Sequence, residues 1–243
     1  MSNPSTRANS HHGKPHFASA ALTALCISIS TAAWADTKSF DLSGFDGVSV
    51  AEGIHMQVTS GKTFEVTAES RDVEQLELLK LSVRRGTLKA EMDGFMKRPE
   101  GQKVTVHVTM PELTHVEASS GADFDADAMA GSDLELTSSG GASLKINAIN
   151  AGKVSVTVSG GANIKIADGT CTALTADASG GASLDMKAME CATADVDASG
   201  GADLSAYAGS ISASASSGAG IRVYGAPKVN KVSSSGGGEI DFR

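Results

Sequence analysis

The sequence is poor in the large residues that usually fill a protein core, since aromatic residues make up only 4% of its 243 positions. Trp34 is its one tryptophan, and Tyr207 and Tyr224 are its two tyrosines. Such a chain must bury many small aliphatic residues in a thin core rather than pack large rings. Proline is also scarce, and none occurs between Pro111 and Pro227. Every backbone N–H in this long stretch is therefore free to pair within a sheet.

Basic residues are few relative to acidic ones: 20 Lys and Arg stand against 28 Asp and Glu, for a net charge of −8. Binding to nucleic acid requires a basic patch that displaces counterions from phosphates, so no nucleic-acid partner is expected. Beyond residue 35 the histidines are His55, His107 and His115, which lack metal-motif spacing such as H-x-x-x-H. We therefore expect no metal and no other cofactor.

The first 35 residues have the pattern of a secretory signal peptide. Arg7 and Lys14 supply positive charge, an apolar run follows them, and a small-x-small cleavage pattern ends at Ala35. Cleavage there would leave residues 36–243, with 18 basic and 28 acidic residues and a net charge of −10. We expect an exported protein of the periplasm, the cell envelope or the extracellular medium. No membrane span is expected in the mature chain, because no apolar run there is long enough.

From Ala122 onward the chain repeats itself about every 20 residues. Each unit begins with a Ser-Gly-Gly-Ala turn and continues with a strand of alternating polarity, as in SGGASLKI at Ser139 and SGGANIKI at Ser159. The repeat positions are Ala122, Ala142, Ala162, Ala182 and Ala202, with looser copies at Ala219 and Gly238. A fixed period of this length is typical of a solenoid, in which one small unit is stacked many times.

Shifting the sequence by one period places apolar residues over apolar residues and polar over polar. One predicted inward column contains Phe124, Leu144, Ile164, Leu184, Leu204 and Ile221. Parallel coils that pair at a spacing of ~4.8 Å account for this register. The sequence therefore predicts an all-β fold, a parallel β-helix with about 20 residues per coil. The competing fold, an antiparallel β-sandwich, gives no reason for columns that keep their residue type.

Residues 36–103 are less regular than the rest, and we interpret them as degenerate N-terminal coils and an irregular cap, because the open end of a stack must be covered. Residues 104–243 are predicted to form the regular repeats, so that one continuous domain spans residues 36–243. At 20 residues per coil this domain would contain about ten coils.

A Met-Pro-Glu-Leu step at residues 110–113 follows an alternating valine strand, and stacked Ser-Gly-rich turns with short alternating strands follow it. In these features the chain resembles the head GIN domain family of autotransporter-adhesin-like proteins, from about Phe45 to Phe242. The resemblance implies a secreted or cell-envelope protein with a right-handed parallel β-helix. It brings no catalytic residues.

The residues themselves also point away from catalysis. Each SGGA turn is followed by a strand, whereas a phosphate-binding loop requires a helix there, so these turns are structural. The uniform repeat units leave no long loops to wall a substrate groove. We therefore predict no catalytic residues and a non-enzymatic, adhesin-like surface-recognition or scaffold module, whose partner is an unidentified surface protein or glycan. The alternative is a polysaccharide-active β-helix enzyme. The sequence predicts no particular oligomeric state.

Two acidic groups are candidate cation ligands. Three carboxylates alternate along one predicted strand: Asp123, Asp125 and Asp127. Neighbours on one face of a strand lie ~6.6–6.8 Å apart, too far to share one ion, and we expect Lys145 in the next coil to neutralise Asp125. The stacked pair Asp177 and Asp197 forms a tighter cluster, but a solvated acidic face is the simpler interpretation. No metal site is predicted.

Cysteine is rare, and its positions are informative. Cys26 falls in the predicted signal peptide, whereas Cys171 and Cys191 lie 20 residues apart, which is one full period. Their Cα atoms should then lie ~4.8 Å apart, within the ~4.4–6.8 Å range of disulfides. Because an exported compartment permits oxidation, we predict a structural disulfide between them. Two stacked, buried thiols are the alternative.

Overall fold

The computed structural model describes residues 35–93 and 104–243, which all fall within one compact unit of the chain. It is nearly all β, with 68% strand and 3% helix, and forms a β-solenoid of about six turns that are about 20 residues apart. The predicted all-β solenoid and its period are therefore confirmed. The predicted signal peptide lies outside the described residues, except for Ala35.

In chain order the elements are β1 (Asp36–Phe40), β2 (Gly47–Val50), β3 (His55–Ser60), β4 (Glu65–Ser70), α1 (Val73–Leu78), β5 (Leu79–Arg84), β6 (Thr87–Met92), β7 (Thr105–Met110), β8 (His115–Ala118), β9 (Asp123–Ser138), β10 (Ser143–Val158), β11 (Asn163–Ile166), β12 (Gly169–Ala178), β13 (Ser183–Ala198), β14 (Asp203–Ser216), β15 (Gly220–Tyr224), β16 (Lys228–Ser235) and β17 (Glu239–Phe242).

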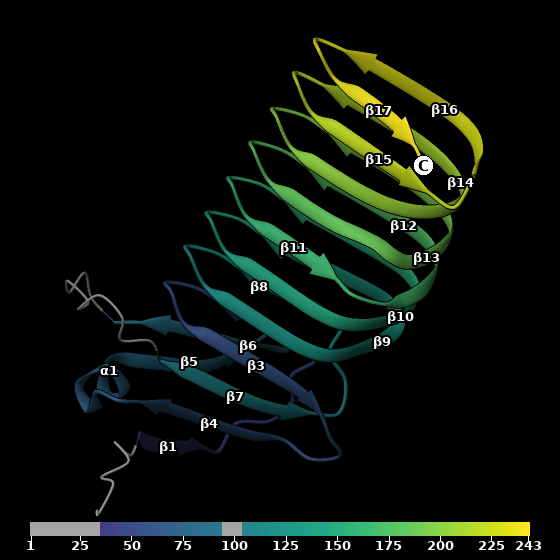
Figure 1. Cartoon of the computed structure of the whole chain (residues 1–243). Coiled ribbons are helices and arrows are strands. Elements are labelled where there is room, and N and C mark those ends of the chain that lie inside the picture. Colours follow the sequence, from purple (N-terminus) through teal and green to yellow (C-terminus); the bar gives the residue numbers. More distant parts are fainter. Residues whose placement is uncertain (1–34, 94–103) are drawn as a thin grey trace, which may run out of the picture. The chain divides into compact units, whose positions relative to one another are not determined.

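The stacked coils present two faces (Figure 1). Strands β3, β11 and β15 pair in parallel with the N-terminal halves of β9, β10, β13 and β14, and β17 pairs in parallel with β15; we call this the first face. Strands β8, β12 and β16 pair in parallel with the C-terminal halves of the same long strands, and β2 pairs in parallel with β8, which gives the second face. Each long strand bends at a corner and so serves both faces.

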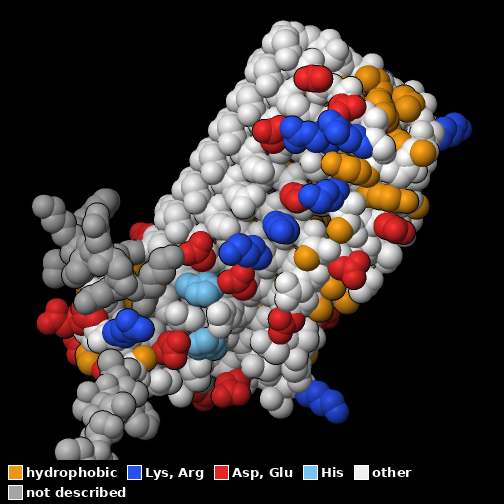
Figure 2. Space-filling model, viewed as in Figure 1, with side chains coloured by type: hydrophobic (Ala, Val, Ile, Leu, Met, Phe, Trp, Pro, Cys, Tyr) orange, Lys and Arg blue, Asp and Glu red, His pale blue; other side chains and the backbone are white. Residues whose placement is uncertain are grey.

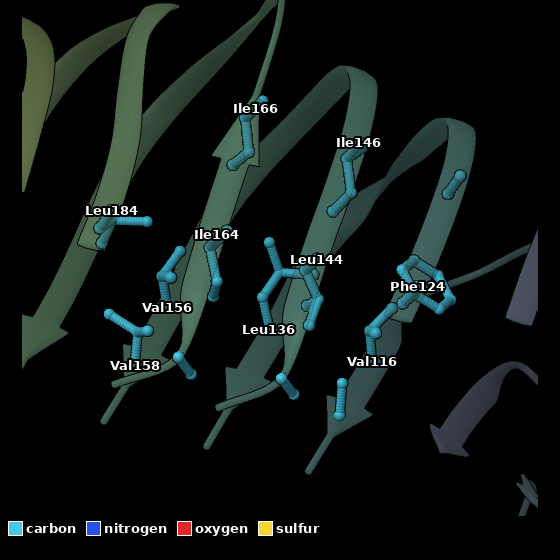
Figure 3. Packing of buried hydrophobic residues seen from close by; sticks show 14 of the residues in the cluster. Val116, Phe124, Leu136, Leu144, Ile146, Val156, Val158, Ile164, Ile166 and Leu184 are labelled. Atoms are coloured by element: carbon cyan, nitrogen blue, oxygen red, sulfur yellow. The ribbon is translucent and has the colours of Figure 1, made fainter. Parts of the chain in front are cut away.

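The core lies between the two faces and consists of ladders of apolar side chains (Figure 3). Leu144 lies in register with Phe124 on one side and with Ile164 on the other, and all three are at most 1% exposed. Leu184, Leu204 and Ile221 continue this column in the later coils. The predicted inward column is confirmed. Its residues are small enough to close a core only two strands thick.

The Ser-Gly-Gly-Ala segments form the tight turns between the second face and the next coil. In the turn at Ser139 the Ala142 N–H donates to the Ser139 carbonyl at 3.1 Å, while Gly140 and Gly141 have φ angles of 57° and 76°. Positive φ at both central positions defines a type I′ turn, which glycine adopts without steric cost. The Gly141 N–H also donates to the Gly160 carbonyl of the next coil at 3.1 Å. The turns therefore stack as part of the solenoid.

The N-terminal strands follow a different plan. β2 and β3 pair in parallel with β8 and β9, but β4 pairs antiparallel with β1 and β7, and β5 pairs antiparallel with β6. The short helix α1 begins after Asp72, whose side chain accepts a hydrogen bond from the Glu74 N–H at 3.0 Å. Because these residues form antiparallel strands and a helix, they add no regular coils. The expected count of about ten coils is therefore wrong, and about six is the observed number.

Candidate functional site

One hollow on the solenoid lies on the second face, where β8, β9, β10 and β12 are neighbours. It has a volume of about 530 Å³. Polar side chains that line it include His115, Asp133, Glu135, Lys153, Ser155 and Thr175, and the buried Leu134 and Val154 also contribute. Leu134 and Val154 are only 2% and 1% exposed, so the surface that a ligand would meet is formed mainly by the polar side chains.

The repeat register places these polar side chains in two columns. His115, Glu135, Ser155 and Thr175 are successive register partners along one column, and Asp133, Lys153 and Ala173 are partners along the next. Alternation along each strand turns them outward, because Leu134 and Val154 between them point into the core. The 20-residue spacing therefore places these polar residues side by side on the outer surface of the second face.

Within the hollow, the His115 Nδ1 atom lies 3.3 Å from the Glu135 Oε2 atom. Among the described residues Lys153 has no ion-pair partner, although Asp133 is its register neighbour. The side chains thus offer an ammonium group, two carboxylates and hydroxyl groups toward solvent. Together they can donate hydrogen bonds to a ligand and accept hydrogen bonds from it.

The same geometry bears on nucleophilic catalysis in this hollow. Glu135 occupies the rung between His115 and Ser155, so the imidazole and the hydroxyl lie two rungs, or ~9.6 Å, apart. A serine nucleophile needs its base within ~2.6–3.2 Å. The arrangement therefore supplies an imidazole–carboxylate pair without an adjacent nucleophile.

The first face is more strongly charged, and Figure 2 shows acidic and basic side chains following one another along it. A hollow of about 380 Å³ lies toward its C-terminal end, beside Asp203, Arg222 and Tyr224. Its cations are largely engaged by carboxylates: Arg222 lies 3.5 Å from Asp203, and Lys187 lies 3.3 Å from Asp185. These pairs leave less charge available for a ligand than the hollow on the second face does.

A smaller hollow of about 310 Å³ on the second face contains the stacked carboxylates Asp177 and Asp197. The pKa of Asp177 is raised above its ordinary value, chiefly by partial desolvation and further by the charges of Asp197 and Asp195. In residues 35–93 and 104–243, no group of three or more His, Cys, Asp or Glu side chains is arranged to hold a metal ion.

The alternating carboxylates of β9 find partners in different parts of the chain. Asp125 contacts His55 of β3, with its Oδ2 atom 2.6 Å from the imidazole Nε2 atom. Asp127 accepts a hydrogen bond from the Asn147 side chain at 3.4 Å. Lys145 is the register neighbour of Asp125, but the ion pair of this carboxylate is with His55. The expectation that Lys145 neutralises Asp125 is therefore corrected.

Cys171 and Cys191 are register partners on β12 and β13, and the structure joins them in a disulfide with a Cα–Cα distance of 4.4 Å. Both are buried, with exposed fractions of 7% and 3%. Neither cysteine lines the hollow beside His115. Oxidation of these thiols in the exported protein stays a prediction.

Sequence reasoning did not identify the hollow beside His115. That histidine was considered only for metal spacing, and the sequence analysis assigned no role to Asp133 or Lys153. The available signal was the repeat itself, since residues 133, 153 and 173 differ by one period. Whether such a column lies above a hollow depends on how the long strands bend at their corners, which the spacing does not encode.

The fold and its outward hollow define a non-globular, repeat-built β-solenoid. The chain belongs to the head GIN domain family: the family model described as “Putative auto-transporter adhesin, head GIN domain” matches residues 44–227, which is more than half of the chain. The resemblance inferred from the repeat is thereby confirmed. None of the curated proteins compared with the chain matches it.

Solved structures share the fold at low sequence identity. A protein from Bacteroides fragilis NCTC 9343, described as a “putative adhesin”, has a TM-score of 0.81 and 18% identity, over 86% of this chain and 97% of that one. A protein from Parabacteroides merdae ATCC 43184 with the same description has a TM-score of 0.68 and 14% identity, over 86% of this chain and 96% of that one. A “putative lipid binding protein” from Parabacteroides distasonis ATCC 8503 has a TM-score of 0.64 and 19% identity, over 86% of this chain and 96% of that one.

In residues 35–93 and 104–243 no helix has the length and apolar character that a bilayer span requires.

Proposed function

We propose that this protein is an exported, non-enzymatic recognition module of the cell envelope, and that the hollow beside His115 binds a surface glycan. The observation that carries the proposal is the hollow itself, in which hydroxyls, carboxylates and an unpaired ammonium group face solvent. Membership in a family described as adhesin-like supports a role in surface recognition.

The charges of the hollow indicate which glycans fit best. Asp133 and Glu135 bring two carboxylates against the single ammonium group of Lys153, and the whole chain has a net charge of −8. Acidic polysaccharides would be repelled by this field. Neutral sugars, or sugars with amino groups, would instead offer hydroxyl and ammonium donors to the carboxylates.

A glycan array tests the binding proposal directly. The chain from Ala35 onward, labelled at its N-terminus, should bind a subset of neutral or amino-bearing glycans and should not bind uronic-acid polymers. Binding to no glycan on the array would contradict the proposal. Capture of a surface protein in a parallel pull-down, without any glycan signal, would instead indicate protein recognition by the module.

Export is a separate part of the proposal and has its own test. Expression of the full sequence in a Gram-negative host should yield protein in the periplasm or the medium whose intact mass begins at Asp36. Full-length protein confined to the cytosol would contradict export, whatever the array shows.

The polysaccharide-degrading alternative predicts a different outcome. Incubation with pectin, alginate or neutral polysaccharides should release no new reducing ends, because the uniform repeats form no long loops that would wall a substrate cleft, and the net charge of −8 repels acidic substrates. A reproducible release of oligosaccharide that is lost on heating would favour the enzyme.

A further inference from the structure

The last coil of the solenoid ends in two open sheet edges. Among the described residues β16 pairs only with β14, and β17 pairs only with β15. The outer edges of both strands therefore present unpaired backbone N–H and C=O groups, which form a template for a further strand. The two edges lie at the end of the stack on its two faces (Figure 1).

This end also exposes the apolar columns that every inner coil covers. Val229 lies in register with Ile211, Val232 with Ala213, and Phe242 with Val223. The three inner residues are at most 3% exposed, whereas Val229, Val232 and Phe242 are 48%, 44% and 42% exposed. In the described part of the chain, one other large hydrophobic residue is comparably exposed, namely Val73 on α1. Figure 2 shows hydrophobic side chains near this end of the stack.

The two edge strands carry opposite charges on their outward sides. Lys228 and Lys231 of β16 continue outward columns through Ser210 and Ser212, and neither lysine has an ion-pair partner among the described residues. On β17 the outward residues are Glu239 and Asp241. Arg243, just after β17, lies 2.6 Å from Asp241, so the outward side keeps a net negative charge through Glu239. Pairing of β16 with the β16 of another chain is thus disfavoured, because lysines would face lysines. Pairing of β16 with the β17 of another chain is favoured, because lysines would face carboxylates.

We infer that this end binds a second copy of the chain, with β16 of each copy pairing antiparallel with β17 of the other. The strands of the two faces run in opposite directions across the core (Figure 1). A half-turn about an axis parallel to them brings each β16 beside the β17 of the other copy, with antiparallel chains, so both contacts form at once. Val229 and Val232 then meet the apolar side of the facing β17, and the two cores become continuous.

The inference goes beyond glycan recognition, because it concerns the end of the stack and not the hollow. Sedimentation equilibrium of the chain from Ala35 onward should show a monomer–dimer equilibrium. The double variant Val229→Lys with Val232→Lys should be monomeric. The matched control is Val73→Lys, which removes the other exposed apolar side chain and should leave the dimer unchanged.

Charge reversal distinguishes this arrangement from other dimers. Lys228→Glu with Lys231→Glu should raise the dissociation constant at least ~tenfold, and so should Glu239→Lys with Asp241→Lys, because each places like charges together in both contacts. An equimolar mixture of the two variants should form a heterodimer about as stable as the wild-type dimer, since both contacts again join opposite charges.

The outcomes are distinct. A wild-type chain that stays monomeric at high concentration would overturn the inference, as would a dimer that survives Val229→Lys with Val232→Lys. Long filaments would also contradict the two-fold pairing, as would the absence of a heterodimer in the mixture of charge variants. Circular dichroism of each variant checks that the coils remain folded, and the charge variants, which alter only exposed side chains, test the inference even if the valine variant unfolds.

Discussion

At the residue scale, glycine at the two central turn positions serves two different purposes. Gly160 and Gly161 have φ angles of 61° and 74°, in the left-handed region that side chains disfavour. A Cβ atom on Gly160 would lie 3.1 Å from the backbone nitrogen of Gly140 in the preceding coil, whereas one on Gly161 would meet nothing within 4 Å. The first glycine therefore provides close stacking as well as backbone freedom, and the second provides backbone freedom alone.

This difference predicts unequal costs for two adjacent substitutions. Gly161→Ala should lower the free energy of unfolding by ~1–2 kcal/mol through backbone strain, and Gly160→Ala should cost more because its methyl group also crowds the neighbouring turn. Urea denaturation of both variants measures the difference. An equal or smaller cost at Gly160 would show that the stacked turns can separate freely.

Asp177 predicts a pH dependence of stability. Because its pKa is higher in the folded chain than the ordinary value of 3.8, the charged form destabilises the fold above the folded pKa, and this penalty vanishes below the unfolded pKa. Asp177→Asn should therefore raise the melting temperature at pH 7 and leave it nearly unchanged near pH 3. Thr157→Asn, in the same column, is the control that should show no such dependence. A gain in melting temperature that persists at pH 3 would show that the effect of Asp177→Asn does not come from removing a charge.

The disulfide is tested by thiol labelling. The mature chain, denatured without reductant, should show no free thiol, and reduction should then release two from Cys171 and Cys191. Reduction should also lower the free energy of unfolding by ~3 kcal/mol, as expected for a loop of this length. Two free thiols before reduction would leave a pair of stacked, buried cysteines as the correct description.

At the scale of elements, the repeat made the strand faces predictable. Alternation along a strand and conservation of polarity across one period assigned Leu144 and Ile164 to the core, and both are fully buried. The pairing of His55 with Asp125 was not predictable in the same way, because 70 residues separate them and β3 lies outside the regular repeats. Contacts between irregular and regular elements depend on how the N-terminal strands meet the first coil.

Two neighbours on β11 provide a matched test of the inward ladder. Ile164 is fully buried, and Asn163 is exposed on the same strand between Ser143 and Ser183 of the adjoining coils. Ile164→Asp should unfold several coils, because a buried carboxylate without a partner costs several kcal/mol. Asn163→Asp should change stability by less than ~0.5 kcal/mol. Circular dichroism during thermal unfolding measures both, and similar curves for the two variants would contradict the assigned faces.

At the scale of the whole molecule, the sequence predicted the solenoid but overestimated its number of coils. A constant period identifies stacked units wherever it holds, yet between Asp36 and Met110 there is no period to count. There the chain uses antiparallel pairing of β4 and β5, which local alternation does not distinguish from parallel pairing. The hollow and the open C-terminal edges are likewise properties of the assembled stack.

The central functional claim is that recognition occurs in the hollow beside His115, and two tryptophan substitutions on β10 test it most directly. Ser155 lines the hollow, whereas Thr157, two residues along the same strand, also faces outward but does not line it. Equilibrium binding to a glycan selected by the wild-type chain should weaken at least ~tenfold, or about 1.4 kcal/mol, in Ser155→Trp, because the indole ring fills the hollow. Thr157→Trp should bind like the wild type. Equal binding by both variants would place recognition elsewhere on the molecule.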